Sequence, residues 1–292
     1  MRREHNRLSL IFTGVVLLVV LLGGAPSRDI PRLGGQEPTP TAIKKIASLE
    51  APRLFLANTI ATVEPAILPP SVSSFAAQVS DLRSGEILFQ FNASAQWSLA
   101  SLTKLMTAVV ALERLSEEVS YTASFRAVAT EGAAGYLVAG KKYSLPELLR
   151  LMLVFSSNDA AVVLAEQYGT DKFISAMNEK ADSLKMRHTR FFDPSGLSPL
   201  NQSSAEDLHK LLAYIFRNFP QIFLISRENI EGATHPFIAD PDFLGGKTGF
   251  LDEAGGNLVS LFNHVDRSLL IIVLGSEQRA EDTQILKDWF AN

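Results

Sequence analysis

The stretch that decides the fold is SLTKLMTAVVALERL, residues 101–115. From Leu102 to Leu115 it contains neither proline nor glycine, and most of its side chains are apolar or small. This pattern predicts a buried helix that starts at Ser101. Lys104 follows Ser101 by three positions, and positions i and i+3 share a helix face. The sequence therefore predicts contact between a hydroxyl and an amine in the first turn of a buried helix.

The segments around this helix alternate strand-like and helix-like patterns. The runs 75–79 and 86–91 flank a turn at Arg83-Ser84-Gly85 and predict a hairpin. Helices are predicted from Pro146 to residue 155, over 159–168, over 171–184 after a cap at Thr170, and over 204–217 with Ser204 as cap. Three strands at 243–250, 257–263 and 268–275 precede an amphipathic helix at 278–290. We expect an α+β fold, an antiparallel sheet with terminal helices on one face and a central helical block.

Residues 1–25 have the pattern of an export signal. Arg2, Arg3 and Arg7 precede an uncharged apolar stretch from Leu8 to Ala25. Positive charge before such a stretch predicts export of the chain that follows. The stretch is at the short end for a membrane span, and it ends on the small-residue pattern of a signal cleavage site. We expect either an anchor at the extracytoplasmic face of the bacterial cytoplasmic membrane or a secreted protein with a cleaved signal.

Composition limits what the rest of the chain can do. Eight of the 14 prolines fall in residues 26–70, which predicts an extended spacer before one folded domain at 71–292. The absence of cysteine excludes disulfides, thiolate metal sites and cysteine nucleophiles. The formal net charge of -4 does not favour sequence-independent electrostatic binding of nucleic acid. The five histidines have no metal-binding spacing, so we expect neither a metal nor a cofactor.

Ser101 and Lys104 are candidates for a nucleophile and its base. A serine hydroxyl becomes nucleophilic when a neighbouring base takes its proton. A lysine can be that base when burial or a nearby cation lowers its pKa. A helix N-terminus also directs free N–H groups toward a forming oxyanion. We expect Lys247 to lie close enough to Lys104 to lower its pKa by like-charge repulsion.

Two further polar stretches can complete such a site. Ser156-Ser157-Asn158 lies between two predicted helices, where a hydroxyl can relay a proton and an amide can hold a substrate carbonyl. Serine and asparagine are also usual in loops and caps. Lys247-Thr248-Gly249 lies in a predicted strand after two glycines, where an ammonium and a hydroxyl can face a substrate carboxylate.

The segment Gly246-Lys247-Thr248 also matches the end of a phosphate-binding P-loop. That motif needs a glycine where this chain has Pro241, and it needs a helix where a turn and strand are predicted. We therefore expect no nucleotide binding.

Together, Ser-x-x-Lys, Ser-x-Asn and Lys-Thr-Gly in this order are the signature of penicillin-binding proteins and serine β-lactamases. From about residue 75 to 290 the sequence closely resembles the serine-type D-alanyl-D-alanine carboxypeptidases of peptidase family S11, the low-molecular-mass penicillin-binding proteins. The matching stretches are 100–108 (ASLTKLMTA), 156–161 (SSNDAA), 192–197 (FDPSGL) and 246–249 (GKTG) with Ala254-Gly255. Many relatives carry a C-terminal β-domain and anchor beyond this domain, so here the N-terminal segment would have to anchor the protein.

The resemblance implies a role for each matching residue. Ser101 would attack the carbonyl of the penultimate D-alanine and form an acyl-enzyme, and Lys104 would take its proton. Ser156 would pass a proton to the leaving D-alanine, and Asn158 would hold the substrate backbone. The remaining substrate-binding residues would be Lys247, which supplies positive potential, Thr248 and Arg279, which bind the terminal carboxylate, Gly249, and Phe250, whose backbone N–H joins that of Ser101 in the oxyanion hole. β-Lactams would bind covalently at Ser101.

Several other functions stay open beside the carboxypeptidase. A D,D-endopeptidase that cuts peptidoglycan cross-links uses the same residues. A serine β-lactamase needs a way to hydrolyse the acyl-enzyme quickly; in class A enzymes this is a glutamate, and the corresponding region from Arg187 to Ser204 contains none. An inactive wall-binding module is disfavoured because all catalytic side chains are present, and a zinc carboxypeptidase is disfavoured by the spacing of the histidines.

Overall fold

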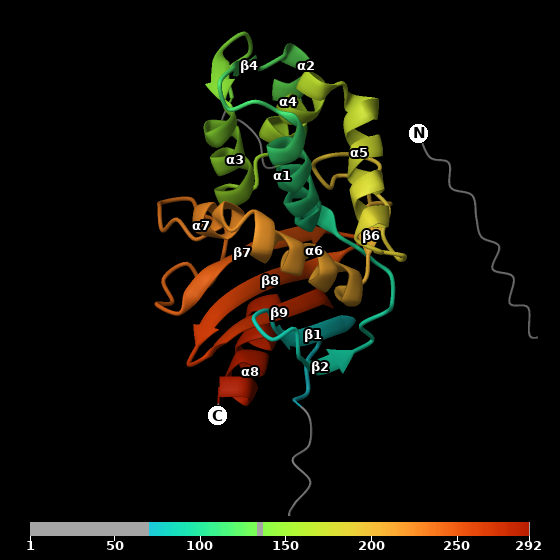
Figure 1. Ribbon diagram of the computed structural model, residues 1–292, viewed down its shortest axis with the longest axis vertical. Coiled ribbons are helices and arrows are strands. Elements are labelled where there is room, and N and C mark those ends of the chain that lie inside the picture. Colours follow the sequence, from blue (N-terminus) through green and yellow to red (C-terminus); the bar gives the residue numbers. More distant parts are fainter. Residues whose placement is uncertain (1–69, 133–136, 292) are drawn as a thin grey trace, which may run out of the picture. The chain divides into compact units, whose positions relative to one another are not determined.

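The computed structural model describes residues 70–132 and 137–291 (Figure 1). The predicted export segment at 1–25 and the spacer up to residue 69 lie outside the described residues. Among the helices of the described part, none combines the length and apolar character that crossing a membrane requires.

A five-stranded antiparallel sheet forms the base of the domain. Its strands are β1 (Ala76–Asp81), β2 (Ile87–Phe91), β7 (Phe243–Leu251), β8 (Gly255–His264) and β9 (Arg267–Ser276), in the order β2-β1-β9-β8-β7. Strand β1 pairs with β9 along its whole length, from Ala76 opposite Leu274 to Asp81 opposite Leu269. The predicted hairpin and the three predicted C-terminal strands are confirmed, and the first and last parts of the domain share one sheet.

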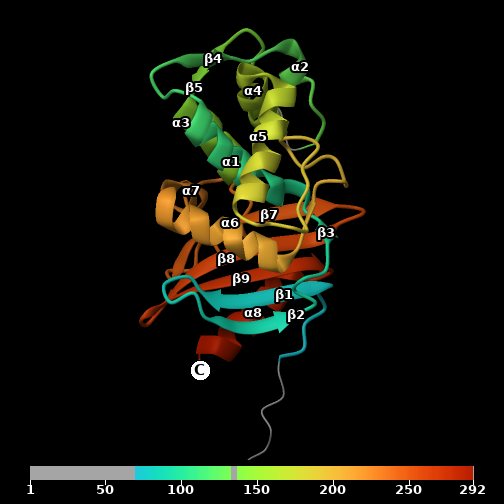
Figure 2. The same ribbon diagram turned by 45° about the vertical axis from the view of Figure 1, so that its right-hand side comes forward.

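Helices cover both faces of this sheet (Figures 1 and 2). Successive strand residues point to opposite faces, so Ile271 packs with Leu286 of α8 (Arg279–Ala291), whereas Ile272 packs with the core beneath α6 (Ala205–Asn218). The predicted α+β fold is confirmed. In the described part of the chain, the C-terminal helix α8 packs on the sheet face opposite α6.

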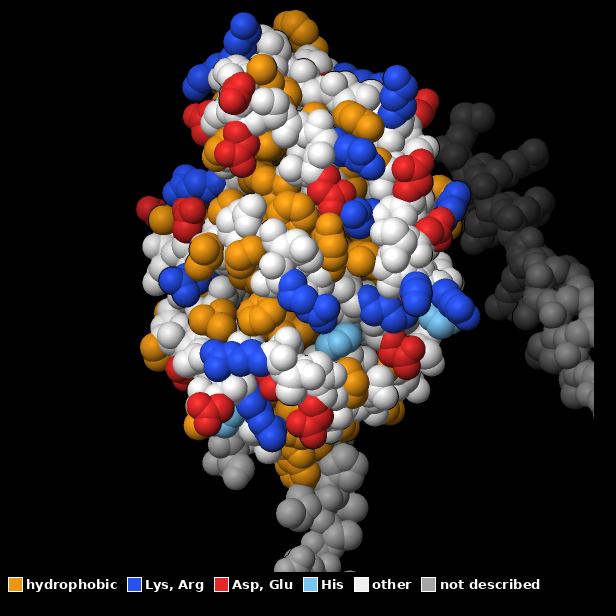
Figure 3. Space-filling view, in the orientation of Figure 1, with side chains coloured by type: hydrophobic (Ala, Val, Ile, Leu, Met, Phe, Trp, Pro, Cys, Tyr) orange, Lys and Arg blue, Asp and Glu red, His pale blue; other side chains and the backbone are white. Residues whose placement is uncertain are grey.

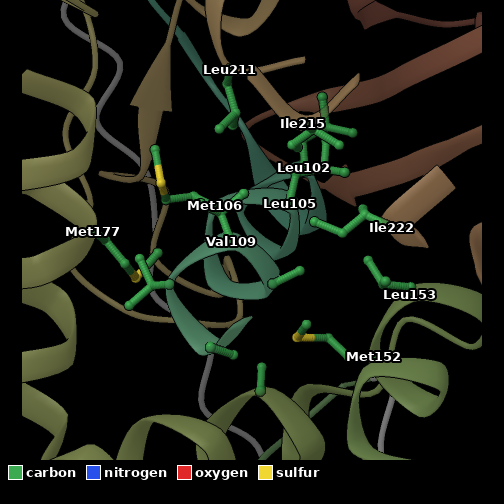
Figure 4. Packing of buried hydrophobic residues seen from close by; sticks show 14 of the residues in the cluster. Leu102, Leu105, Met106, Val109, Met152, Leu153, Met177, Leu211, Ile215 and Ile222 are labelled. Carbon is green, nitrogen blue, oxygen red and sulfur yellow. The ribbon is translucent and has the colours of Figure 1, made fainter. Parts of the chain in front are cut away.

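The central helical block is built around α1 (Thr103–Arg114). The helices packed nearby are α2 (Phe125–Val128), α3 (Leu145–Val154), α4 (Asn158–Tyr168), α5 (Thr170–Ser183) and α7 (Gln221–Ser226). Figure 4 shows Met152 of α3, Met177 of α5 and Ile222 of α7 converging on α1 from different sides. Residues Thr103 to Ala111 are all buried, so α1 is a fixed platform for the residues at its first turn.

Local signals explain most helix starts, and two predictions about them need correction. Ser204 caps α6 as predicted, because its Oγ accepts a hydrogen bond from the N–H of Asp207. Thr170, predicted as a cap, is instead the first residue of α5, and the N-cap is Gly169, which has no side chain to offer. Ser101 was predicted to open an α-helix. It lies in a 3₁₀ turn, η2 (Ala100–Leu102), and the α-helix starts at Thr103.

Short strands escaped prediction because two or three residues carry no periodic pattern. β3 (Trp97–Ser98) pairs with β6 (Gln202–Ser203), and β4 (Ser120–Thr122) pairs with β5 (Lys142–Ser144). The first of these pairs joins the segment before Ser101 to the segment before α6.

Charged side chains are spread over the face of the domain shown in Figure 3. Basic and acidic side chains lie among each other there, with apolar and neutral atoms between them. A nucleic-acid-binding face gathers positive charge in one patch or stripe. This face therefore lacks the electrostatic character of a nucleic-acid-binding surface.

Candidate active site

Two glycines hold the turn that carries Ser101. A Cβ at Gly249 of β7 would lie 2.8 Å from the carbonyl oxygen of Leu99 and 3.3 Å from the nitrogen of Leu102. A Cβ at Gly196 would lie 1.9 Å from the carbonyl oxygen of Ala100. Neither contact leaves room for a side chain, so the turn is clamped between β7 and the loop 192–198. This explains why glycine occupies position 249, one of the predicted site residues.

Lys104 is fully buried and makes three polar contacts. Its Nζ lies 2.7 Å from Oδ1 of Asn158, 2.6 Å from the carbonyl oxygen of Ser195 and 2.8 Å from Oγ of Ser101. The first two partners can only accept: Ser195 offers a carbonyl, and the Asn158 amide is oriented by its Nδ2, which donates to the carbonyl of Glu131. A neutral amine that donates two N–H groups to these acceptors turns its lone pair toward the hydroxyl of Ser101. The predicted contact between Ser101 and Lys104 is thereby found in the geometry of a nucleophile and a base.

Burial favours the neutral form of this amine. Desolvation lowers the pKa of Lys104 from 10.5 to about 7, against the opposing influence of the Asp193 and Asp159 carboxylates. Repulsion between Lys104 and Lys247 is seen in the pKa of Lys247, which lies well below the usual value, first through burial and then through Lys104 and Arg279. The two amines are therefore close enough to interact, as predicted, while burial is the main cause of the shift at Lys104.

The carbonyl of Ser195 is fixed by a turn that Asp193 organises. Oδ1 of Asp193 accepts hydrogen bonds from the backbone N–H groups of Ser195 and Gly196, each at 2.7 Å, and Oδ2 accepts from that of Ser198 at 2.8 Å. The same turn is tied to α1, because Thr107 donates to the carbonyl of Pro194 at 2.6 Å. Both oxygens of Asp193 therefore serve the shape of the loop that faces Lys104.

The segment 156–158 links this cluster to a second one. Ser156 adopts a left-handed backbone conformation with φ of 61° at the end of α3, and Ser157 caps α4 by accepting from the N–H of Ala160. Oγ of Ser156 accepts from Nζ of Lys247 at 2.9 Å, and Lys247 also donates to the carbonyl of Thr248 at 3.0 Å. The segment thus gives Asn158 to the Lys104 cluster and Ser156 to the Lys247 cluster, which brings all three sequence motifs into one site.

The predicted carboxylate-binding residues lie on and beside β7. Oγ1 of Thr248 donates to Oγ1 of Thr234 at 3.2 Å, and Thr234 in turn donates to the carbonyl of Val154 at 3.1 Å. Nη1 of Arg279 donates to the carbonyl of Gly249, which places the guanidinium next to the Lys-Thr-Gly segment. Phe250 follows on the same strand with a side chain that is 62% exposed. The binding roles of these residues remain predictions.

Sequence reasoning missed the groups that hold the site in place. The carbonyls of Ser195 and Glu131 and the hydroxyl of Thr234 carry no motif of their own. A signal was available at Asp193-Pro194-Ser195-Gly196, where an aspartate before a proline and a glycine is typical of a turn. What the turn contacts could not be inferred from that pattern.

The chain resembles known proteins over most of the described domain. Residues 63–278 match the family model Peptidase_S11, described as D-alanyl-D-alanine carboxypeptidase. The D-alanyl-D-alanine endopeptidase of Pseudomonas aeruginosa is 31% identical over 81% of this chain and 86% of its own length. D-alanyl-D-alanine carboxypeptidase DacA of Haemophilus influenzae is 29% identical over 77% of this chain and 64% of its own length.

Solved structures agree with this assignment. A D-alanyl-D-alanine carboxypeptidase from Mycobacterium tuberculosis superimposes with a TM-score of 0.71 at 28% identity, covering 79% of this chain and 96% of that chain. Penicillin-binding protein D2 from Listeria monocytogenes in its cefotaxime-bound form gives a TM-score of 0.63 at 25% identity, covering 76% and 98%. From its sequence match, its fold and the grouping of its three motifs, the chain belongs to the peptidase S11 family of D-alanyl-D-alanine carboxypeptidases and is a serine peptidase.

Proposed function

We propose that this protein removes the terminal D-alanine from peptidoglycan stem peptides through an acyl-enzyme on Ser101, and that β-lactams acylate the same serine. The observation that carries the proposal is the arrangement around Lys104: two obligate acceptors orient a buried amine whose pKa is about 7, and its remaining contact is the hydroxyl of Ser101. Such a group is matched to proton transfer near neutral pH.

The steps follow from the contacts. Oγ of Ser101 attacks the carbonyl carbon of the penultimate D-alanine while its proton moves to Nζ of Lys104. The oxyanion is stabilised by the backbone N–H groups of Ser101 and Phe250. The tetrahedral intermediate collapses, the C–N bond breaks, and Ser156, held by Lys247, passes a proton to the leaving amine. Water then hydrolyses the ester, which releases the shortened peptide and restores Ser101.

The test combines labelling with turnover. Mass spectrometry after penicillin treatment is expected to place one adduct on the peptide that contains Ser101, and a stem pentapeptide is expected to lose one D-alanine. Ser101→Ala abolishes both results, and Ser183→Ala, which removes an exposed hydroxyl at the end of α5, is the matched control. An adduct on another residue would contradict the nucleophile, and labelling without hydrolysis of any D-Ala-D-Ala peptide would contradict the substrate.

A D,D-endopeptidase that cuts cross-links is the second candidate. Relatives named D-alanyl-D-alanine endopeptidase and relatives named carboxypeptidase both match this chain, at 31% and 29% identity. Both reactions use the same acyl-enzyme, so they differ in the leaving group. Incubation with cross-linked muropeptide dimers distinguishes them, because a strict carboxypeptidase leaves the dimers intact.

We also propose that the domain works outside the cytoplasm, held at the membrane by its N-terminal segment. The support is the arginine-rich start before the apolar stretch Leu8 to Ala25. A reporter that is active only after export, fused behind Asn292, is expected to be active in the full chain and inactive when residues 1–25 are deleted. Equal reporter activity in both fusions contradicts the proposed extracytoplasmic location.

A further inference from the structure

A pocket of about 510 Å³ opens beside Arg279 and Phe250, and the steps above assign no ligand to it. Its lining includes Arg279 and Phe250, and Arg279 donates to the carbonyl of Gly249 in the strand that clamps the Ser101 turn. The family resemblance implies that Arg279 binds the terminal carboxylate, which belongs to the leaving residue. The pocket therefore lies next to the leaving group.

One wall of the pocket is an aromatic ring held on three sides. Nε1 of Trp97 donates to the carbonyl of Ala254 at 2.7 Å, and its ring stacks on Phe75 with centroids 4.1 Å apart. A Cβ at Gly275 would lie 2.8 Å from the indole, so this glycine lets the ring approach the backbone. Trp97 thus presents a rigid apolar surface, although no catalytic step requires it.

The floor of the pocket is open because its backbone carries little side-chain volume. Gly255, Gly256 and Gly275 all line it. A Cβ at Gly256 would lie 3.1 Å from Cδ of Arg279, so the aliphatic part of this arginine lies against the backbone there. Besides these glycines, the pocket is lined by the apolar residues Trp97, Phe250 and Ala254 and by the polar residues Ser276 and Glu277. The methyl group of a leaving D-alanine would fill only a small part of it.

We propose that this pocket binds the side chain of an extended leaving residue, and that Trp97 determines this specificity. The ligand is a D-configured amino acid whose carboxylate lies on Arg279 and whose aliphatic side chain continues into a second peptide. This is the chemistry of a peptidoglycan cross-link, in which the nitrogen of the scissile bond belongs to the neighbouring stem. The inference rests on the proposed acyl-enzyme and deepens it, because it assigns the endopeptidase reaction to a defined surface.

The chemical step is unchanged by the larger leaving group. The bond from the D-alanine carbonyl to Oγ of Ser101 forms, the C–N bond to the neighbouring stem breaks, and the new amine takes its proton through Ser156. Water then cleaves the ester, so one dimer and one water give two monomers. The pocket contributes binding of the departing stem while the C–N bond is still intact.

The test compares two substrates in the full-length protein. Trp97→Ala is expected to lower kcat/KM for a cross-linked dimer about tenfold more than for a monomeric pentapeptide, since it removes the apolar wall along an aliphatic chain. Trp97→Phe keeps a ring and is expected to retain most of the dimer activity. Trp289→Ala, at the far end of α8, is the matched control and leaves the ratio of the two activities unchanged.

Each outcome decides between the proposals. The rate of penicillin acylation reports the state of Ser101 in every variant, because it needs no departing stem. Normal acylation with a selective loss on the dimer supports the pocket. Equal losses on dimer and monomer, or a wild-type enzyme that hydrolyses only the monomer, overturn the assignment of the pocket and leave the carboxypeptidase standing. A wild-type enzyme that is acylated but hydrolyses neither substrate overturns the proposed function itself.

Discussion

Burial of Lys104 lowers the pKa of its amine, and this affects both the rate of acylation and the free energy of unfolding. Replacing Lys104 is expected to slow acylation strongly while changing the stability little. Its amine has a pKa of about 7 in the folded chain against 10.5 in the unfolded chain. At pH 7 about half of the folded molecules hold a neutral amine, whereas an ordinary lysine would be neutral in roughly one molecule in 3,000. Burial therefore enriches the active base by about 10³-fold. Loss of the base in Lys104→Met is expected to slow penicillin acylation by roughly 10²- to 10⁴-fold.

The stability of the same variant is expected to change little at neutral pH. The shift of the Lys104 pKa from 10.5 to about 7 opposes folding by about 4 to 5 kcal/mol at pH 7. Methionine removes that penalty, but it leaves the buried acceptors on Asn158 and Ser195 without their donor, at about 1–3 kcal/mol each. The two effects nearly cancel, so the thermal midpoint stays within a few degrees.

The sign of the pH dependence follows from the lowered pKa. Between pH 7 and 10.5 the unfolded chain binds more protons at Lys104 than the folded chain, so the folded state gains stability as pH rises. Relative to Lys104→Met, the wild type is expected to gain about 1.4 kcal/mol per pH unit in urea titrations over this window. Wild-type acylation is expected to rise with pH around a midpoint near 7 as the base loses its proton.

Two results would refute this reasoning. Lys104→Arg keeps a cation but cannot lose its proton near neutral pH, so it is expected to acylate as slowly as Lys104→Met. Acylation at the wild-type rate in Lys104→Arg means that another group is the base. A rate midpoint near 10 means that burial does not tune Lys104.

Three further substitutions test the packing at the Ser101 turn, the cap of α6 and the binding of the substrate carboxylate. Gly196→Ala is expected to destabilise the fold by more than about 3 kcal/mol in urea titrations, because its Cβ would lie 1.9 Å from the carbonyl of Ala100 at a φ of 88°; a midpoint equal to wild type contradicts the clamp. Ser204→Ala removes the cap of α6 and is expected to lower the free energy of unfolding by about 1 kcal/mol, whereas no change means that another group satisfies that helix end. Arg279→Gln is expected to raise KM about tenfold for a peptide with a free terminal carboxylate. KM for the same peptide with an amidated C-terminus is expected to stay nearly unchanged. Equal effects on both peptides argue against carboxylate binding.

The sequence was most informative where patterns are long. The uninterrupted run 102–115 and the apolar face of 204–217 predicted α1 and α6, and the three C-terminal strands were found almost residue by residue. The three motifs identified Ser101, Lys104, Ser156, Asn158 and Lys247, which the fold then brings together. Their ordered occurrence is the signature of penicillin-binding proteins and serine β-lactamases, and this resemblance indicated that they belong to one site.

The orientation of Lys104 and the 3₁₀ turn at Ser101 could not be predicted, because backbone groups and distant glycines determine them. The donors of Lys104 are directed by the backbone carbonyl of Ser195 and by an amide that Glu131 orients, and any residue has a carbonyl. The 3₁₀ turn at Ser101 depends on close contact with Gly249 and Gly196, which lie far along the chain. The size of the Lys104 pKa shift could not be predicted for the same reason, since the extent of burial is a property of the packed domain.

The turn at Asp193 has a consequence for antibiotic resistance. In class A serine β-lactamases a carboxylate activates the water that hydrolyses the acyl-enzyme, and the corresponding segment 187–204 contains Asp193 as its one acidic residue. Freeing that carboxylate would release the hydrogen bonds that shape the turn, and Lys104 would lose its acceptor at Ser195. A mutation toward drug hydrolysis at this position would thus weaken the base that the enzyme needs for its own reaction. Selection with penicillin is therefore expected to yield variants that bind the drug poorly, with adducts that persist once formed, and the lifetime of the adduct on Ser101 measures this directly.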